Sequence, residues 1–288
     1  MARPQVAIFA RLANGGTPPV RVIYGQNSKL GRSEHDIRYD AIHDEIVVPV
    51  SAPMSILTFR GDAKDQEAPL RAIYGPKAGD LSGSRLDIDP IHNEIIGYNA
   101  HSIRVYPREG NGDVAPLRVI EGPDTGLNDK NTPIYGIAVD PVNNIIAVGL
   151  NTFFGQNLEP ERMKEVRNPG AILIFNRTDN GNVKPRNVIR GPKSGIIRIN
   201  QVQIIPSRKL IIACMPGIRD QMEPDGAFLG AWSEDDNGDV PPLYKLPADS
   251  TTTLKKPFGV ALDAKHKEVI ITDMRHNGVL VFSLPEIF

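Results

Sequence analysis

Short apolar runs alternate with turn residues along the chain, and one block of this pattern recurs. The block reads SILTFRGDAKDQEAPLRAIYGP from Ser55, SIRVYPREGNGDVAPLRVIEGP from Ser102 and AILIFNRTDNGNVKPRNVIRGP from Ala171, and looser copies start at Ala7 and Ala227. A block that recurs at intervals of roughly 40–50 residues predicts one supersecondary unit copied several times. The repeat therefore predicts the architecture of the chain, but not its chemistry.

Each copy of the block predicts two strands joined by a turn. Asn-Gly between two apolar runs is a strong hairpin signal, because both residues tolerate the positive φ that such turns require. A proline opens the second strand, which favours an outer position since proline cannot donate to a β-ladder. The first strands end at Phe9, Phe59, Tyr106, Phe175, Trp232 and Phe282, and the turns begin at Asn14, Lys64, Asn111, Asn180 and Asn237.

A second hairpin separates these blocks and occurs five times. Its first strands span 37–39, 86–88, 137–139, 202–204 and 260–262, and its second strands read EIVVPV, EIIGYN, IIAVGL, LIIACM and EVIITD. Each unit thus holds four short strands, a–b–c–d, and only 159–166 suggests a helical turn. Repeated four-stranded units of this length favour an all-β propeller over a sandwich.

The number of strands favours five blades over six. The chain predicts five a–b hairpins and five d strands, but six c strands. We expect one propeller domain over 1–288, whose ring closes when the C-terminal strands at 260–282 pair with the d strand near 20–24. The N-terminal c strand at 6–9 is then surplus: it would add a fifth strand to the closing blade, self-associate with another molecule, or belong to a six-bladed parent.

Two segments carry a resemblance to known propeller repeats. GIAVDPVNNIIAV from Gly136 and FGVALDAKHKEVIITD from Phe258 each combine an apolar strand, an aspartate, a turn and a second apolar strand. They resemble the repeats of NHL and YVTN-type propellers, and the resemblance covers nearly the whole chain. It implies the propeller fold, but these propellers include lyases, lactonases and binding modules, so it implies no single activity.

The composition narrows the classes of partner. The 288 residues carry 33 basic and 34 acidic side chains, with no basic run, so neither a nucleic acid nor a membrane surface is indicated as a partner. The single cysteine, Cys214, is expected to be a buried apolar residue of a b strand, and no disulfide can form within the chain. We recognise no signal peptide and no transmembrane run, and the cellular compartment is left open.

Candidate binding residues gather at one face of the predicted propeller. In this resemblance the d–a and b–c loops share one face around the central channel, and the a–b and c–d turns share the other. The residues just before each a strand differ from blade to blade while the strands repeat, and such variation is typical of specificity. The predicted binding residues are Glu34, His35, Asp36, Arg85, Tyr135, Asn200, Gln201 and His276.

Within this set, the run Glu34–Asp36 is the densest ionisable group, since a carboxylate beside a histidine can orient and tune it. A solvated polar loop is the alternative interpretation. The b–c loops add His101, the pair Arg275–His276 near Asp273, and two insertions at 151–169 and 216–226. Their apolar and charged residues suit recognition of a small molecule or a protein, and a helix at 159–166 would cover the channel as a lid.

The face formed by the a–b and c–d turns carries fewer candidate functional residues. His43, His92 and His266 occupy equivalent a–b turns on separate blades, so we expect a structural role rather than a shared metal. Acidic c–d turns such as SEDDNGDV from Ser233 lack the downstream bidentate glutamate of the EF-hand pattern, so calcium is not expected there.

Three functions are compatible with the residues. The favoured one is a ligand- or protein-binding propeller that uses the d–a/b–c loop face. The alternatives are a metal-dependent hydrolase resembling lactonase propellers, with a divalent cation held in the central channel, and a lyase resembling streptogramin lyase, with His276 or His35 as its base. For a channel cation only Asn200, Gln201 and the Glu34/Asp36 pair are suitably placed, because a hard cation prefers oxygen ligands.

Several other chemistries are excluded by the absence of their motifs. The sequence contains no GxSxG nucleophile elbow, phosphate loop, dinucleotide fingerprint or CxxC knuckle. No cofactor is evident beyond the channel cation, and whether the protein is an enzyme is left open.

Overall fold

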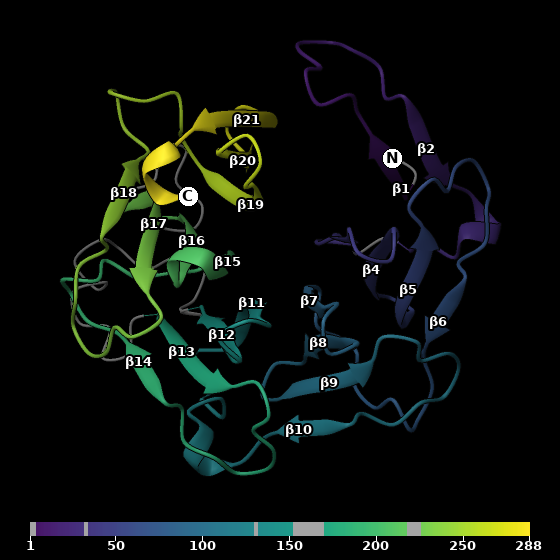
Figure 1. Ribbon diagram of the computed structural model, residues 1–288, viewed down its shortest axis with the longest axis horizontal. Helices are drawn as coiled ribbons and strands as arrows, with labels where there is room; N and C mark the ends of the chain where they lie inside the picture. Colours follow the sequence, from purple (N-terminus) through teal and green to yellow (C-terminus); the bar gives the residue numbers. More distant parts are fainter. Residues whose placement is uncertain (1–3, 32–33, 130–131, 152–169, 218–225) are drawn as a thin grey trace, which may run out of the picture. The chain divides into compact units, whose positions relative to one another are not determined.

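Antiparallel sheets of short strands make up the fold (Figure 1). The computed structural model describes residues 4–31, 34–129, 132–151, 170–217 and 226–288. The fold is an all-β, five-bladed propeller, as the repeat predicts. The described helices are single 3-10 turns, and none of them has the length and apolar character needed to cross a membrane.

Four sheets contain four strands in the order a–b–c–d along the chain. Blade 1 consists of β3 (Arg38–Asp40), β4 (Glu45–Ser51), β5 (Met54–Arg60) and β6 (Arg71–Ile73). Blade 2 consists of β7 (Leu86–Asp89), β8 (Glu94–Tyr98), β9 (Ile103–Pro107) and β10 (Arg118–Ile120). Blade 3 consists of β11 (Ile134–Asp140), β12 (Ile145–Leu150), β13 (Ala171–Asn176) and β14 (Asn187–Ile189). Blade 4 consists of β15 (Gln201–Ile205), β16 (Leu210–Pro216), β17 (Ala227–Ser233) and β18 (Tyr244–Pro247).

The strands of the remaining repeat lie at the two ends of the chain. At the N-terminal end, β1 (Gln5–Ile8) and β2 (Arg21–Tyr24) form an antiparallel pair. At the C-terminal end, β19 (Pro257–Asp263), β20 (Glu268–Asp273) and β21 (Gly278–Ser283) form a three-stranded sheet. The surplus c strand of the sequence analysis is thus β1, and it pairs with β2.

The chain folds into two compact units. Unit 1 comprises residues 1–99 and 104–117, and unit 2 comprises residues 100–103 and 118–288. Two predictions depend on how these units associate: that the ring closes, and that residues 1–288 form a single domain. Both stay predictions. In unit 2, the first strands β11, β15 and β19 lie innermost, and the last strands β14 and β18 lie at the outer margin (Figure 1).

Apolar side chains fill the space between neighbouring sheets within each unit. In unit 1, Val47 and Ile56 of blade 1 pack in one cluster with Ile95 of blade 2. In unit 2, Ile172 of blade 3 packs in one cluster with Trp232 of blade 4. Because a central sheet is covered on both faces, its b and c strands are apolar on both faces, which explains runs such as IIAVGL.

A polar contact also joins the outer strand of one blade to the next blade. In unit 1, Ile73 of β6 forms an isolated parallel bridge with Gly112, which lies in the c–d turn of blade 2. The preceding residue, Asn111, completes this contact, since its Oδ1 accepts a hydrogen bond from the backbone N–H of Ala72 at 3.1 Å. We call this arrangement the asparagine clasp.

The clasp occurs twice in unit 2, at Gly181 with Asn180 and Val119, and at Gly238 with Asn237 and Val188. The N–H to Oδ1 distances there are 3.0 and 2.9 Å. Each clasp satisfies a backbone donor on an outer strand, which would otherwise be left open to solvent or to another chain.

The turns of the clasps correct one detail of the sequence analysis. We expected both residues of each Asn-Gly pair to have positive φ. Among the described residues, Gly112, Gly181 and Gly238 do, with φ values of 79°, 74° and 82°, but the asparagines before them do not. The asparagine is required for its side-chain acceptor, and only the glycine is required for its backbone conformation.

The residue that follows the Asn-Gly pair of a clasp contacts the glycine near the end of the preceding repeated block. This contact explains why that position holds glycine. In unit 2, Asn182 Oδ1 accepts a hydrogen bond from the backbone N–H of Asp124 at 2.8 Å, in the loop that follows β10. Gly122 starts this loop with φ 133°, and a Cβ atom there would lie 2.4 Å from Asn182 Oδ1. The glycine is needed for both reasons, namely its backbone angle and the close approach of the neighbouring turn.

Replacing Asn180 with alanine is expected to lower the free energy of unfolding by about 1 kcal/mol, because the N–H of Val119 loses its acceptor. Asn180→Asp keeps an acceptor oxygen and should retain most of the stability. Chemical denaturation of the full chain measures the difference, with the exposed Lys184→Ala in the same connection as the control. Equal stability of Asn180→Ala and the wild type would contradict a stabilising clasp.

Candidate functional site

In unit 1, the predicted binding residues of blades 1 and 2 lie where the chain enters β3 and β7. Asp36 is buried, and its Oδ1 accepts the backbone N–H of Ile37 at 2.9 Å. Its Oδ2 accepts the backbone N–H of Leu86, the first residue of β7, at 3.3 Å. Asp36 therefore ties blade 1 to blade 2.

A buried ion-pair network continues from Asp36. Arg38 donates from Nη1 to Asp36 Oδ1 at 2.5 Å and from Nε to Asp87 Oδ1 at 3.0 Å. The remaining nitrogen, Nη2 of Arg38, is buried and has no hydrogen-bond partner within the described protein. A buried guanidinium donor without an acceptor is costly, so this atom marks a place where a ligand acceptor would be favourable.

Arg85 lies beside this network. Its side chain is buried, donates from Nη1 to Ser84 Oγ at 3.3 Å, and forms a hydrogen bond with Tyr98 at the end of β8. Burial raises the pKa of Tyr98, so its phenol stays neutral. We call the seven residues of this region the entrance cluster: Glu34, His35, Asp36, Arg38, Arg85, Asp87 and Tyr98.

Three ionisable groups of the entrance cluster, Glu34, His35 and Asp36, have pKa values shifted toward their neutral forms. Although burial opposes the effect, the carboxylates of Asp36 and Asp87 raise the pKa of Arg38. Burial raises the pKa of Asp36, although the charge of Arg38 opposes this effect. Burial likewise raises the pKa of Glu34. The pKa of His35 is lowered, first by partial burial of the imidazole and then by the positive charge of Arg85. His35 is therefore a neutral imidazole near pH 7, available as a hydrogen-bond acceptor or a base.

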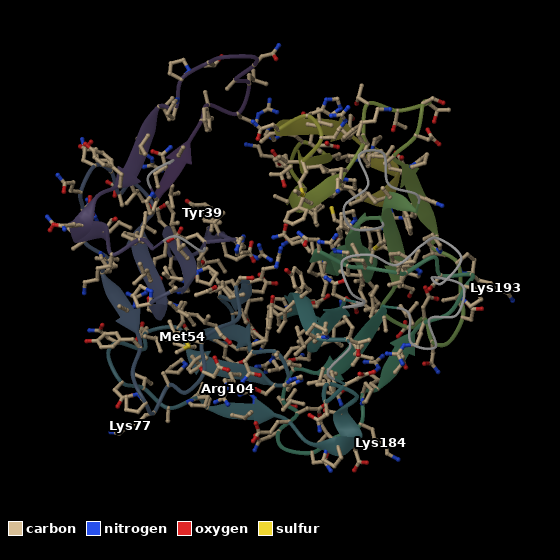
Figure 2. All side chains as sticks on the ribbon, turned by 180° about the vertical axis from the view of Figure 1, so that it is seen from behind. Tyr39, Met54, Lys77, Arg104, Lys184 and Lys193 are labelled. Carbon is tan, nitrogen blue, oxygen red and sulfur yellow. The ribbon has the colours of Figure 1, made fainter. Side chains whose placement is uncertain are left out.

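Figure 2 helps to locate the cluster within unit 1. Tyr39, the residue after Arg38, lies on β3 and is 60% exposed, and Lys77 lies on a loop at the margin of the unit (Figure 2). Of the entrance cluster, Arg38 and Asp87 lie in the first strands β3 and β7, Tyr98 ends β8, and the other members lie in the loops that lead into the first strands.

In unit 2, Asn200 and Gln201 are buried and connect blade 4 to the C-terminal sheet. Asn200 donates from Nδ2 to the carbonyl oxygen of Phe258 at 2.5 Å, and Gln201 Oε1 accepts the backbone N–H of Val260 at 2.6 Å. Gln201 therefore repeats, in blade 4, the contact that Asp36 makes in blade 1. Asn200 Oδ1 is buried with no hydrogen-bond partner among the described atoms.

Tyr135 lies at an irregular position of its strand. The pairing of β11 with β12 shifts between Ile134 and Gly136, which makes Tyr135 a bulged residue. β19 has the equivalent shift between Pro257 and Gly259, at Phe258. A bulge redirects the side chain that it carries, and bulges are frequent beside binding sites.

His276 and Asp273 hold two loops of the same face together. His276 Nε2 donates to the carbonyl oxygen of Thr253 at 2.7 Å. Asp273 accepts backbone N–H groups of Lys255, Lys256, Arg275 and His276, which together lower its pKa although burial opposes them. His101, in another b–c loop, contacts the carbonyl oxygen of Leu127 at 3.2 Å. These side chains thus have structural roles in the described protein.

The structure therefore groups part of the predicted set. It brings Glu34, His35, Asp36 and Arg85 together in unit 1, and it places Asn200 and Gln201 side by side against β19 in unit 2. Tyr135 and His276 lie in other loops and strands of unit 2. Most of the two predicted insertions, and the predicted helix at 159–166, fall outside the described residues.

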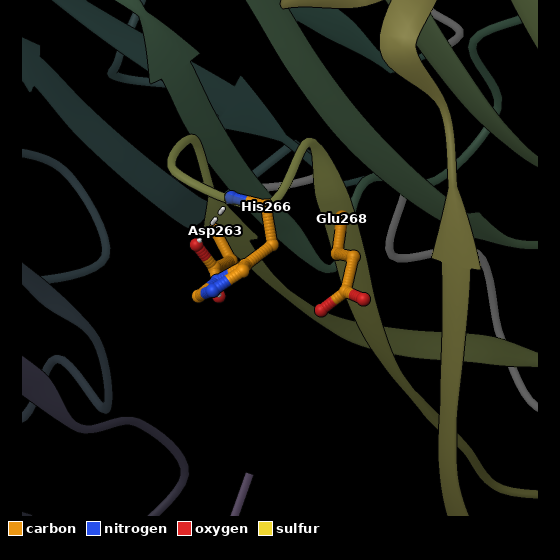
Figure 3. A group of neighbouring side chains, drawn as sticks. All are labelled: Asp263, His266 and Glu268. Carbon is orange, nitrogen blue, oxygen red and sulfur yellow. Dashed lines mark hydrogen bonds and ion pairs between the residues drawn. The ribbon is translucent and has the colours of Figure 1, made fainter. Parts of the chain in front are cut away.

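On the opposite face, Asp263, His266 and Glu268 present three ligand atoms within 4.8 Å of one another (Figure 3). His266 Nδ1 lies 2.7 Å from Asp263 Oδ2, within a single a–b turn. The same 2.7 Å contact joins His43 to Asp40 and His92 to Asp89. A contact repeated in three blades indicates a structural lock for the turn, in agreement with the structural role expected for these histidines.

Unit 2 also contains a buried carboxyl pair that the sequence analysis missed. Glu234 follows β17, at the position where blades 2 and 3 hold Arg108 and Arg177. Burial and a hydrogen bond with the buried Asp140 raise the pKa of Glu234 to about 8. Glu234 is therefore mainly protonated at neutral pH and donates to Asp140.

The sequence analysis also did not predict the pairing of Arg38 with Asp87. They occupy equivalent positions in β3 and β7, where the other first strands have Ala138, Gln203 and Ala261. A basic and an acidic residue at one register position of neighbouring blades is a detectable signal for a salt bridge between blades. The residues before the strands do not reveal this pair, because both members lie within the strands.

Compared with known proteins, the chain matches no protein-family model and no curated protein.

The stability of the protein is expected to fall as the pH rises from about 4.5 to about 8, and then to level off, as far as Glu234 contributes. The folded protein keeps a proton on Glu234 that the unfolded chain, with an ordinary pKa of 4.5, has lost in this range. Glu234→Gln keeps a donor for Asp140 without the titration. Its melting temperature should exceed that of the wild type by roughly 5 °C or more at pH 8–9, and the gain should vanish near pH 4.5.

Differential scanning calorimetry across this pH range measures the effect. The exposed Glu121→Gln provides the matched control, and its melting temperature should follow the wild type at every pH. A pH-independent gain for Glu234→Gln would contradict a shared proton between Glu234 and Asp140.

Proposed function

We propose that the protein is a binding propeller whose ligand site lies on the d–a/b–c loop face, at the entrance cluster of unit 1. The propeller fold is compatible with a binding scaffold and with an enzyme. The choice between them rests on the residues at the entrance.

The observation that carries this proposal is the buried charge of the entrance cluster. Equivalent positions in the other first strands are filled by small or neutral residues such as Ala138 and Ala261, so the fold does not require ions there. Burying Arg38 and Asp36 costs desolvation free energy, and Nη2 of Arg38 receives no acceptor in return. Perturbed ionisable groups of this kind are typical of binding and catalytic sites.

The cluster favours a small polar ligand with a hydrogen-bond acceptor. An acceptor group of the ligand would meet Nη2 of Arg38, and the neutral imidazole of His35 would contribute a further hydrogen bond. In unit 2, Asn200 Oδ1, buried without a hydrogen-bond partner among the described atoms, is proposed as an acceptor of its own, with Gln201, Tyr135 and His276 as further binding residues of that unit. The resemblance to NHL and YVTN-type repeats supports this placement, as a likeness only.

An enzyme is the second candidate, because a raised pKa at Glu34 next to a lowered pKa at His35 suits acid–base chemistry. In this alternative the protein is a lactonase-like hydrolase or a streptogramin-lyase-like enzyme, with a divalent cation in the central channel. Asn200 Oδ1 offers one oxygen for such a cation.

A thermal-shift panel of small carboxylates, phosphates, sugars and nucleotides tests the binding proposal. At least one class should raise the melting temperature of the wild type. We expect His35→Ala to abolish that rise, and Asn200→Ala tests the acceptor of unit 2 separately. His43→Ala, in an a–b turn of the same unit, is the control and should keep the rise. The proposal fails if no compound stabilises the protein, or if His35→Ala responds like the wild type.

Metal analysis of the purified full chain separates the two candidates. A binding propeller is expected to contain no stoichiometric divalent ion after dialysis. One bound ion per chain, lost in Asn200→Ala, would favour the hydrolase or the lyase. An unaltered metal content in that variant would point to a site elsewhere.

A further inference from the structure

An apolar groove lies beside the a–b turns of unit 2. It has a volume of about 600 Å³ and is lined by side chains of blade 3, blade 4 and the C-terminal sheet. Val142, Ile204, Pro206, Leu262 and Phe288 supply its apolar surface. Val142 is 63% exposed, which is unusual for a valine that borders a ready-made apolar cavity.

The walls of the groove are held in place by polar contacts. Asn143 donates from Nδ2 to the carbonyl oxygen of Pro206 at 3.1 Å, which fixes the turn of blade 3 against that of blade 4. Arg208 donates from Nη1 to the carbonyl oxygen of Phe288 at 3.2 Å, which fixes the C-terminal residue at the other edge. The groove is therefore formed before any partner binds, and binding would not have to order these segments.

Basic residues lie on two of the turns that border the groove. Ser207 and Ala264 line it, and the residues that directly follow them are exposed cations. The four exposed cations of these two turns are Arg208, Lys209, Lys265 and Lys267. On the same turns Asp263 is engaged by His266, Glu268 is partly buried, and Glu286 near the C-terminal residue is the exposed acidic exception. Among the exposed charged side chains of these segments, the cations thus outnumber the carboxylates.

We propose that this groove is a docking site for an acidic peptide segment that carries a large apolar side chain. The apolar side chain would contact Ile204 and Leu262, and the flanking carboxylates would face the lysines of the rim. An open groove with an exposed edge at Val142 leaves one side of its occupant in water, which suits a peptide better than an enclosed small molecule. This site is independent of the entrance cluster.

Fluorescence polarisation with labelled acetyl-Glu-Asp-Leu-Phe-Asp-Glu-amide and the full chain tests the proposal. We expect saturable binding that weakens between about 50 and 500 mM salt, because exposed charges are screened. Two comparison peptides should bind at least about fivefold more weakly, one with lysine in place of the acids and one with alanine in place of leucine and phenylalanine.

Two variants locate the binding. Val142→Asp should weaken it about tenfold, since it places a negative charge at the apolar edge, and Lys265→Glu about fivefold, through the reversed rim charge. The matched controls are Leu243→Asp, at a residue that is 58% exposed directly before the outer strand β18, and Lys193→Glu on a loop at the margin (Figure 2). Both should bind within twofold of the wild type.

The outcomes decide the proposal. It is overturned by absence of peptide binding, by wild-type affinity in both Val142→Asp and Lys265→Glu, or by binding of decanoate without binding of the peptide. If the Val142→Asp variant unfolds, the peptide affinity of the variant at the exposed Lys265, Lys265→Glu, still tests the proposal. Peptide binding that persists in His35→Ala separates this site from the proposed ligand site, so either proposal can fail alone.

Discussion

The contact between neighbouring blades is the constraint on which the rest of the structure depends. A single four-stranded sheet has two apolar faces and an open outer strand, so it cannot be stable by itself. The structure solves both problems with the next repeat. Side chains such as Ile95 and Trp232 fill the space between sheets, and asparagines such as Asn111 satisfy the outer strand. Each repeat is complete only against its neighbour.

The same constraint reaches into the candidate site. Asp36 and Gln201 each accept a backbone N–H from the first strand of the next sheet, although we selected them as ligand-binding residues because they vary. Variation at these positions is therefore compatible with one structural task carried out by different side chains. Two buried polar atoms near these contacts, Nη2 of Arg38 and Oδ1 of Asn200, have no hydrogen-bond partner among the described atoms. We propose that a ligand would bond to such atoms.

The sequence predicted the strands and their order well, because short apolar runs and turn residues repeat with a fixed pattern. It predicted less of the site. Asn180 reads as a hairpin residue, yet its side chain bonds across to another blade, and local pattern does not contain that information. The pairing of Arg38 with Asp87 and of Glu234 with Asp140 likewise joins residues about 50 to 95 positions apart, which become neighbours only through the stacking of sheets.

The asparagine clasp has a consequence for the chemical ageing of the protein. Asn-Gly is the dipeptide most prone to deamidation, because the glycine nitrogen can attack the asparagine side-chain carbonyl without steric hindrance. In the clasps both reacting groups are occupied: Asn180 Oδ1 accepts the N–H of Val119, and the nitrogen of Gly181 donates to the carbonyl oxygen of the same residue at 2.7 Å. Separation of two blades would free both groups at once. The rate of deamidation at these Asn-Gly pairs would therefore increase with the frequency at which neighbouring blades separate.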